Sequence, residues 1–255
     1  MTGISLLADV VAPRSYAEQS RDVLSAPPSR RFFLGTDELG RDRFSRLVHG
    51  TRMSMLLAPA AALLSTALAA LLGGSAGYLG GRWERWFGAI TSMFLSLPWL
   101  FLLLTVRALL PLNVTPVISV AITFLLLGCL GWAMPARIIR AGARTLVNAD
   151  YLTQARAGGT TGMRLFCLHV LPNLRPILFA QFWLSVPVFI LSEANLSLLG
   201  LGVAEPLPSW GTMLRELENY ETVSRSPWML VSVAMLVIVM SCFQIVLRSK
   251  ETPAA

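Results

Sequence analysis

Long apolar runs separated by short polar stretches dominate the sequence. A helix needs about 20 mostly apolar residues to cross the hydrocarbon core of a membrane. Five segments reach that length, at residues 53–79, 86–110, 115–136, 176–201 and 227–247. A shorter apolar stretch at 4–12, which Asp9 interrupts, is interpreted as a fragment of a sixth span. The pattern therefore predicts an all-α, polytopic membrane helical bundle with five full spans.

Prolines mark breaks within this pattern. Pro98 lies in the middle of the second segment and Pro187 in the fourth, and both are expected to kink their helices. Pro111 and Pro116 stand close together between the second and third segments, which predicts a tight turn there.

Composition supports a membrane location. Hydrophobic residues make up 55% of the chain and charged residues 14%, whereas soluble domains carry about 25% charged residues. The net charge is +7. The positive charges lie mostly between the apolar runs, as topology signals do, so no nucleic-acid partner is predicted.

The distribution of arginines predicts the topology. The polar segment 137–175 holds six arginines and a single acid, Asp150. The loop between the fourth and fifth spans is instead acidic. The positive-inside rule places the arginine-rich segment in the cytoplasm and the acidic loop outside. Residues 13–52 then also fall outside, although their eight arginines and five acids fit the rule poorly.

A bent helical segment is predicted within the cytoplasmic loop. Good helix formers follow Asp150, and the pair Gly158 and Gly159 should break that helix. A threonine at 160 or 161 can cap a second short helix, and Pro172 should limit its length. Such an elbow, polar on one side and apolar on the other, is suited to docking in a groove on another protein.

This segment resembles the cytoplasmic coupling loop of bacterial import permeases, whose motif is EAA, three residues, glycine and a later Leu-Pro. Thr153, Gln154 and Ala155 occupy the EAA positions, Gly159 the glycine, and Leu171 with Pro172 the closing pair. Thr153 replaces the usual glutamate and Gln154 the first alanine. Two further stretches, LGTDELGRDRFSRLVHGTRMS at 34–54 and LSEANLSLLGLGVAEPLPSWGTML at 191–214, resemble segments of dipeptide, oligopeptide and nickel ABC permeases.

The resemblance implies a type I ABC importer transmembrane domain at 51–247, with a coupling loop at 137–175. Residues 1–50 would hold a truncated first span and an extracytoplasmic segment, and 248–255 a tail. The implied partners are a second homologous permease, two ATP-binding-cassette ATPases, an extracytoplasmic solute-binding protein and lipid, in the bacterial inner membrane. Asp150 joins the motif residues as an expected ATPase-coupling position. The family usually has six spans.

Enzymatic chemistry is not indicated. No GxxxxGK[ST] phosphate loop is present, so energy would come from partner ATPases, and no catalytic residue, cofactor or metal site is predicted. Residues 73–77 match the G-x-S-x-G nucleophile pattern, but they lie in an apolar helical run rather than at a strand-to-helix turn. Cys129, Cys167 and Cys242 are expected to be small buried hydrophobes. An intramembrane enzyme, a degenerate or inactive permease, and an importer of nickel or another small solute remain as alternatives.

Other polar and small residues have two interpretations each. Glu193 is either a pathway-lining or gating residue or a structural hydrogen-bonding group, with Asn195 nearby. Glycines at four-residue spacing allow close helix packing or mark a flexible helix end; they are Gly73, Gly77 and Gly81. A charged group forms either an amphipathic surface segment or a solvated face with local ion pairs; its members are Arg41, Asp42, Arg43 and Arg46.

Overall fold

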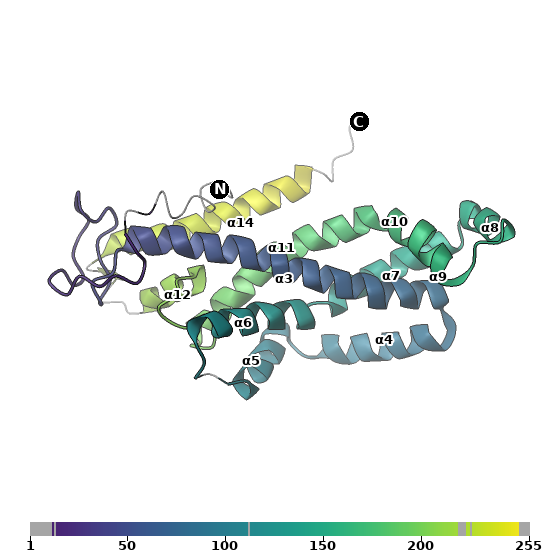
Figure 1. Ribbon diagram of the computed structural model, residues 1–255, viewed down its shortest axis with the longest axis horizontal. Helices are drawn as coiled ribbons and strands as arrows, with labels where there is room; N and C mark the ends of the chain where they lie inside the picture. Colours follow the sequence, from purple (N-terminus) through teal and green to yellow (C-terminus); the bar gives the residue numbers. More distant parts are fainter. Residues whose placement is uncertain (1–11, 13, 112, 219–222, 225, 250–255) are drawn as a thin grey trace. The chain divides into compact units, whose positions relative to one another are not determined.

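The computed structural model describes residues 12, 14–111, 113–218, 223–224 and 226–249. Helices account for all the regular structure in these residues apart from one isolated bridge, which pairs Thr36 with Asp42. The helices in Figure 1 have the following bounds: α3 Arg43–Leu79, α4 Gly81–Ser96, α5 Trp99–Leu109, α6 Pro116–Leu130, α7 Ala133–Val147, α8 Asp150–Ala157, α9 Gly162–Leu165, α10 Leu171–Asn173, α11 Arg175–Leu198, α12 Trp210–Arg215 and α14 Val231–Ser249. The predicted all-α class is confirmed.

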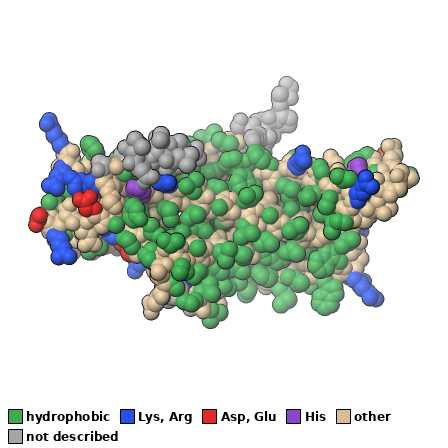
Figure 2. Space-filling view, viewed as in Figure 1, with side chains coloured by type: hydrophobic (Ala, Val, Ile, Leu, Met, Phe, Trp, Pro, Cys, Tyr) green, Lys and Arg blue, Asp and Glu red, His purple; other side chains and the backbone are tan. Residues whose placement is uncertain are grey.

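Four stretches of helix are long and apolar enough to cross a membrane, or five if a bent pair is counted as one span. The four are Arg43–Leu79, Pro116–Val147, Arg175–Leu198 and Pro227–Val246. Hydrophobic side chains cover most of the face shown in Figure 2, with few charged groups among them. Such an apolar surface suits contact with lipid. The helices also pair their backbone polar groups internally, as the hydrocarbon core requires. Four of the five predicted spans are thus confirmed, and the second, at 86–110, corresponds to the bent pair. The fragment at 4–12 lies, except for Ala12, outside the described residues.

The second span is broken rather than merely kinked. Helices α4 and α5 together satisfy the criteria for a span but are bent by 87°. Leu97, which precedes Pro98, has φ −86° and ψ 132°, the extended conformation that a following proline imposes. Pro187, in contrast, lies inside the single helix α11.

The third helical stretch extends further than the sequence suggested. Residues from Arg137 onward were expected to leave the membrane span, but α7 continues to Val147. One side of α7 is buried through Ala136, Ile139 and Ala143. The arginines lie elsewhere on the helix, where Arg140 and Arg144 pair with Glu84 of α4 at 2.7 and 3.3 Å. Because these charges are on the polar side of an amphipathic helix, they do not end it.

The chain divides into two compact units. The first unit comprises Met1–Ala58, Arg107–Phe124 and Pro187–Ala255, and the second comprises Pro59–Val106 and Leu125–Val186. Helices α3, α5, α6 and α11 contribute residues to both units. In α3 and α11 the division falls at a proline within the helix, at Pro59 and Pro187.

The core of the second unit depends on a close approach between α3 and α7. A Cβ atom on Gly73 would overlap the carbonyl oxygen of Ala136, and one on Gly77 would lie 2.8 Å from Cβ of Ala143. The buried core gathers around this contact and consists of Ala69, Ala76, Phe87, Trp132, Ala133, Ala136, Ile139, Ala143, Leu152, Leu165, Phe166, Val170 and Leu174. Small residues thus let two backbones approach where lipid supplies no hydrophobic drive.

Gly81 does not share this packing role. It begins α4 with φ +60°, and no atom lies within 4 Å of a Cβ built on it. Its left-handed conformation, which glycine adopts without strain, instead turns the chain from α3 into α4. Gly81 lies after the end of α3, so the four-residue spacing in the sequence wrongly added it to the packing surface of that helix.

The cysteines also differ from expectation. Cys129, Cys167 and Cys242 are free and exposed rather than buried. Cys129 and Cys242 are on the apolar helices α6 and α14. A small apolar side chain can face outward there because lipid tails are as apolar as a protein core.

Substituting Gly73 by alanine should loosen the contact between α3 and α7. The new methyl group meets backbone atoms that can move only if the helices separate, so we expect a loss of about 1–3 kcal/mol in the free energy of unfolding. Thermal unfolding of the purified chain in detergent measures this. Gly88→Ala in α4, where a Cβ meets nothing within 4 Å, is the matched control and should leave the midpoint unchanged or slightly raised. Equal midpoints for the two variants would contradict the packing role.

Candidate functional site

The predicted elbow is present and lies between α7 and α11. Helix α8 ends at Ala157, and Gly158 follows with φ −76°. Gly159 then takes φ +84°, in the left-handed region that favours glycine. Helix α9 begins at Gly162, so the two helices are joined by a glycine-dependent turn, as the sequence indicated (Figure 1).

Two details of the elbow differ from expectation. Thr161 has the extended conformation of a helix cap, but its side chain makes no capping hydrogen bond. Pro172 does not end the second helix: α9 passes through a π-helical turn at Phe166–Val170 into α10. Pro172 lies in α10, directly after the π-helical turn.

One side of the elbow is fixed to the second unit. Its apolar side chains are buried, namely Leu152, Leu165, Phe166, Val170 and Leu174. Phe166 lies against Gly74 of α3, with its ring atoms 3.2 Å from where a Cβ would be. The hydroxyl of Tyr78 donates a hydrogen bond of 2.9 Å to the carbonyl of Gly162. The elbow is therefore packed on the end of α3 and does not hang free.

The opposite side of the elbow is open. The exposed predicted positions are Asp150, Thr153, Gln154 and Gly159, and the half-buried ones are Ala155, Leu171 and Pro172. Met163 presents an apolar side chain that is 74% exposed, and Arg156 and Arg164 are exposed beside it in the sequence. The structure thus leaves four of the seven predicted positions exposed, whereas Leu152 and Phe166 are buried on the opposite side of the elbow.

Glu193 lies in the first unit and is fully buried. Its Oε1 accepts hydrogen bonds of 2.7 Å from the hydroxyls of Ser197 and Ser209. Ser197 is one turn further along α11, and Ser209 caps α12, so the carboxyl group joins two helices. Asn195 is exposed and is not brought to Glu193, in contrast to the interpretation that paired them.

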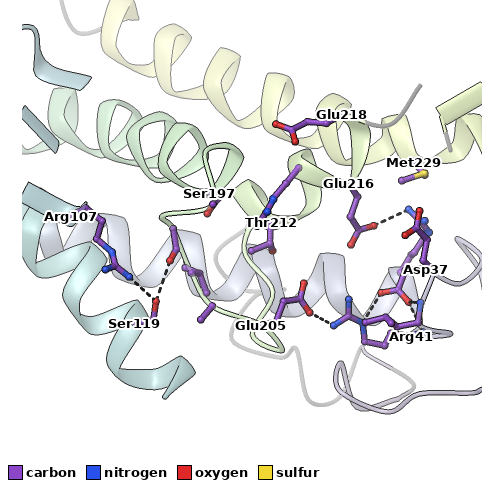
Figure 3. Close-up of a pocket in the computed structure, with 18 residues that line it drawn as sticks. Asp37, Arg41, Arg107, Ser119, Ser197, Glu205, Thr212, Glu216, Glu218 and Met229 are labelled. Carbon is purple, nitrogen blue, oxygen red and sulfur yellow. Dashed lines mark hydrogen bonds and ion pairs between the residues drawn. The ribbon is translucent and has the colours of Figure 1, made fainter. Parts of the chain in front are cut away.

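A charged cluster links the N-terminal segment to the loop after α11 (Figure 3), and the sequence analysis did not predict its distant partners. Asp37 accepts from Arg41 Nε at 2.6 Å, and Arg41 also pairs with Glu205. Arg43 pairs with Glu216 at 3.1 Å. Burial raises the pKa of the Glu216 carboxyl above its usual value, while Arg46 and Arg43 oppose that shift.

Both interpretations of the four charged residues at 41–46 are therefore wrong. Arg41, Asp42, Arg43 and Arg46 are buried, with exposed fractions of 1–6%, and neither cover a surface nor form a solvated face. Arg46 lies within 3.4 Å of Glu205 and 3.5 Å of Glu216. These partners are more than 150 positions away in the sequence, so no local pattern reveals them.

Hydrogen bonds from Trp210 join the two sequence stretches that lie before and after the elbow, at 34–54 and 191–214. Trp210 donates from its indole nitrogen to Thr51 Oγ1 at 3.0 Å and from its backbone nitrogen to Ser54 Oγ at 3.4 Å. Gly50 lies against the backbone of Ser209. Residues 34–54 and 191–214 thus form one packed structure in the first unit.

Ser75, of the G-x-S-x-G pattern, lies inside α3 and donates to the carbonyl of Leu72. In the part of the chain that the structure describes, no group of three or more His, Cys, Asp and Glu side chains could hold a metal ion.

Comparison with known proteins identifies the family of this chain. The family described as the binding-protein-dependent transport system inner membrane component matches residues 69–249. The chain belongs to this family. The match includes the elbow, α11 and the loop that follows it.

Three proteins similar to this permease are peptide transport permeases. The di/tripeptide transport system permease protein DppC of Pseudomonas aeruginosa is 39% identical over 94% of this chain and 78% of its own length. The oligopeptide transport system permease protein OppC of Bacillus subtilis is 34% identical over 88% of this chain and 72% of its own length. The dipeptide transport system permease protein DppC of Bacillus subtilis is 33% identical over 84% of this chain and 65% of its own length.

These matches establish the predicted class. The chain is a permease subunit of an ATP-binding-cassette importer, with the all-α transmembrane domain of type I importers, and a multi-pass protein of the bacterial inner membrane. The resemblance to dipeptide and oligopeptide permeases, drawn from residues 34–54, 150–172 and 191–214, is confirmed.

A substitution at Glu193 separates its two interpretations. Glu193→Leu leaves the hydroxyls of Ser197 and Ser209 without their acceptor, which should cost about 1–3 kcal/mol of unfolding free energy. Glu193→Gln keeps an acceptor oxygen and should unfold within a few degrees of the unmodified protein. Both are followed by thermal unfolding and by uptake in cells. If Glu193→Gln blocked uptake while keeping its unfolding midpoint, Glu193 would be a gating group instead.

Proposed function

We propose that this permease imports di- or oligopeptides. It would pair with a second, homologous permease to form the pathway, with two ATP-binding-cassette ATPases on the cytoplasmic side and an extracytoplasmic solute-binding protein on the other. The names of the relatives, which are dipeptide, di/tripeptide and oligopeptide permeases, support the substrate class. Nickel or another small solute is the alternative substrate named by the sequence resemblance.

The elbow at residues 150–172 is the proposed docking site for an ATPase. The single observation that carries this proposal is its two-sided burial: Leu152 and Phe166 are fixed in the core, while Thr153, Gln154 and Met163 are open. An exposed side with apolar and basic groups suits a groove on a partner protein. Because the buried side is packed on α3, a displacement of the elbow would be transmitted to that helix.

Hydrolysis of ATP is assigned to the partners. The chain lacks a GxxxxGK[ST] loop, so this subunit would receive mechanical work rather than generate it. The domain boundaries follow the same proposal, with the transmembrane domain at 51–247, its coupling segment at 137–175, an extracytoplasmic segment within 1–50 and a tail at 248–255.

A degenerate or inactive permease is the second candidate. Thr153 and Gln154 stand where the family motif has glutamate and alanine. Both are exposed on the open side of α8, so a carboxylate is missing from the surface proposed to dock. Weaker coupling would follow if the ATPase groove presents a cation to that position.

The conformation of Gly159 provides a test of coupling. Alanine at φ +84° is strained by about 1–2 kcal/mol, so Gly159→Ala should shift the elbow out of its docked shape and lower ATP-driven uptake by about tenfold. Gly158→Ala is the matched control, since φ −76° suits alanine, and should import normally. Peptide uptake is measured in cells with equal amounts of each variant in the membrane. Uptake by Gly159→Ala at the control level would contradict a role for this turn.

Topology is tested by cysteine labelling. After replacement of Cys129, Cys167 and Cys242, a single cysteine at Thr161 should react with a membrane-impermeant reagent only from the cytoplasmic side. One at Arg30 should react only from outside. Both positions are exposed, whereas Ser209, in the outer loop, is buried and unsuitable. The reverse labelling pattern would overturn the assignment of the two sides.

A further inference from the structure

Arg107, in the first unit, is a buried cation with weak neutral contacts. Its side chain is at the end of α5 and 1% exposed. Nη1 donates to the carbonyl of Pro111 at 3.4 Å and Nη2 to Ser119 Oγ at 3.3 Å, both longer than usual hydrogen bonds. Nε has no hydrogen-bond partner, and no carboxylate pairs with Arg107 within the described part of the chain. Buried charges are normally paired, so this guanidinium can still accept an anionic partner.

Arg107 is one of the residues that line a cavity of about 560 Å³ in the first unit (Figure 3). That volume is in the range of small-molecule sites. Ser119, which accepts from Arg107, itself donates to the carbonyl of Gly202 at 3.2 Å, so the wall around Arg107 is held in place. Arg41 and Arg43 also line the cavity but pair with Asp37, Glu205 and Glu216.

Charges of both signs line the remaining wall. Arg215 is exposed, as are the carboxylates of Glu38 and Glu218. Such a wall offers partners to groups of both charges rather than to an anion alone. It suits a zwitterion, whose carboxylate can approach the arginine while its ammonium group approaches the acids.

We infer that this cavity binds a transported peptide and that Arg107 receives the peptide's terminal carboxylate. A guanidinium can bind a carboxylate through two parallel hydrogen bonds, and each Nη atom of Arg107 has a second N–H beyond its long contact with Pro111 or Ser119. The inference rests on the proposed function, since it takes peptides as the transported solute.

The test measures binding of trialanine and of its C-terminal amide to the full chain in lipid nanodiscs. The apparent Kd of each comes from the dependence of the thermal unfolding midpoint on ligand concentration. The unmodified protein should bind trialanine about tenfold more tightly than the amide, as expected for one charge-assisted contact. In Arg107→Gln this ratio should fall to about one through weaker binding of trialanine.

Variants and competitors make the result specific. Arg107→Lys keeps the charge without the planar fork and should give an intermediate ratio, which carries the test if Arg107→Gln does not accumulate. Arg137→Gln, an exposed arginine of the second unit, is the matched control and should keep the full ratio. Equal binding of the two peptides to the unmodified protein, a ratio that survives at Arg107→Gln, or tighter binding of inorganic phosphate would each overturn the inference.

Uptake by the unmodified importer separates this inference from the proposed function. If the complete importer does not transport trialanine although the binding ratio depends on Arg107, the carboxylate site stands and the peptide-import proposal fails. If trialanine is transported but the ratio does not depend on Arg107, the importer assignment stands and the carboxylate site is rejected.

Discussion

The close contact of α3 with α7 is the constraint on which the second unit depends. Without side chains at Gly73 and Gly77, the two backbones approach until α3 meets the carbonyl oxygens of α7. The contact reaches Ala143, near the end of α7 and close to where the elbow begins. It also leaves room beside Gly74 for Phe166, through which the elbow is packed back onto α3. Backbone-to-backbone packing makes this attachment of the elbow rigid, because closely packed cores deform little.

In the first unit, ion pairs and hydrogen bonds hold the segments together. Asp37, Arg43 and Arg46 of the N-terminal stretch pair with one another or with Glu205 and Glu216 after α11. Glu193 joins α11 to α12 through two serine hydroxyls. A buried charge that loses its partner is costly, so these pairs fix the register between segments that are distant in sequence. The cavity beside Arg107 is built on this framework.

The sequence predicted those features that local pattern determines. Apolar length located the spans, Pro98 located a break, and Gly158 with Gly159 located the turn of the elbow. It failed where the outcome depends on distant partners. The charges at 41–46 look like a surface segment until Glu205 and Glu216 are placed beside them. Arg137 looks like the end of a span in the sequence. In the structure α7 continues past it, and the later arginines Arg140 and Arg144 pair with Glu84 on the polar side of the helix. Gly81 continues a four-residue spacing, although the helix has already ended.

The central claim is that the open side of the elbow receives an ATPase. A photoreactive amino acid placed at Met163, which is 74% exposed, tests it in membranes that hold the assembled importer, with the same group at Leu125, 60% exposed on the apolar helix α6, as the comparison. The account predicts that illumination joins position 163, but not position 125, to an ATP-binding-cassette subunit. Cross-linking of position 163 to the extracytoplasmic binding protein, or to no other subunit, would contradict it.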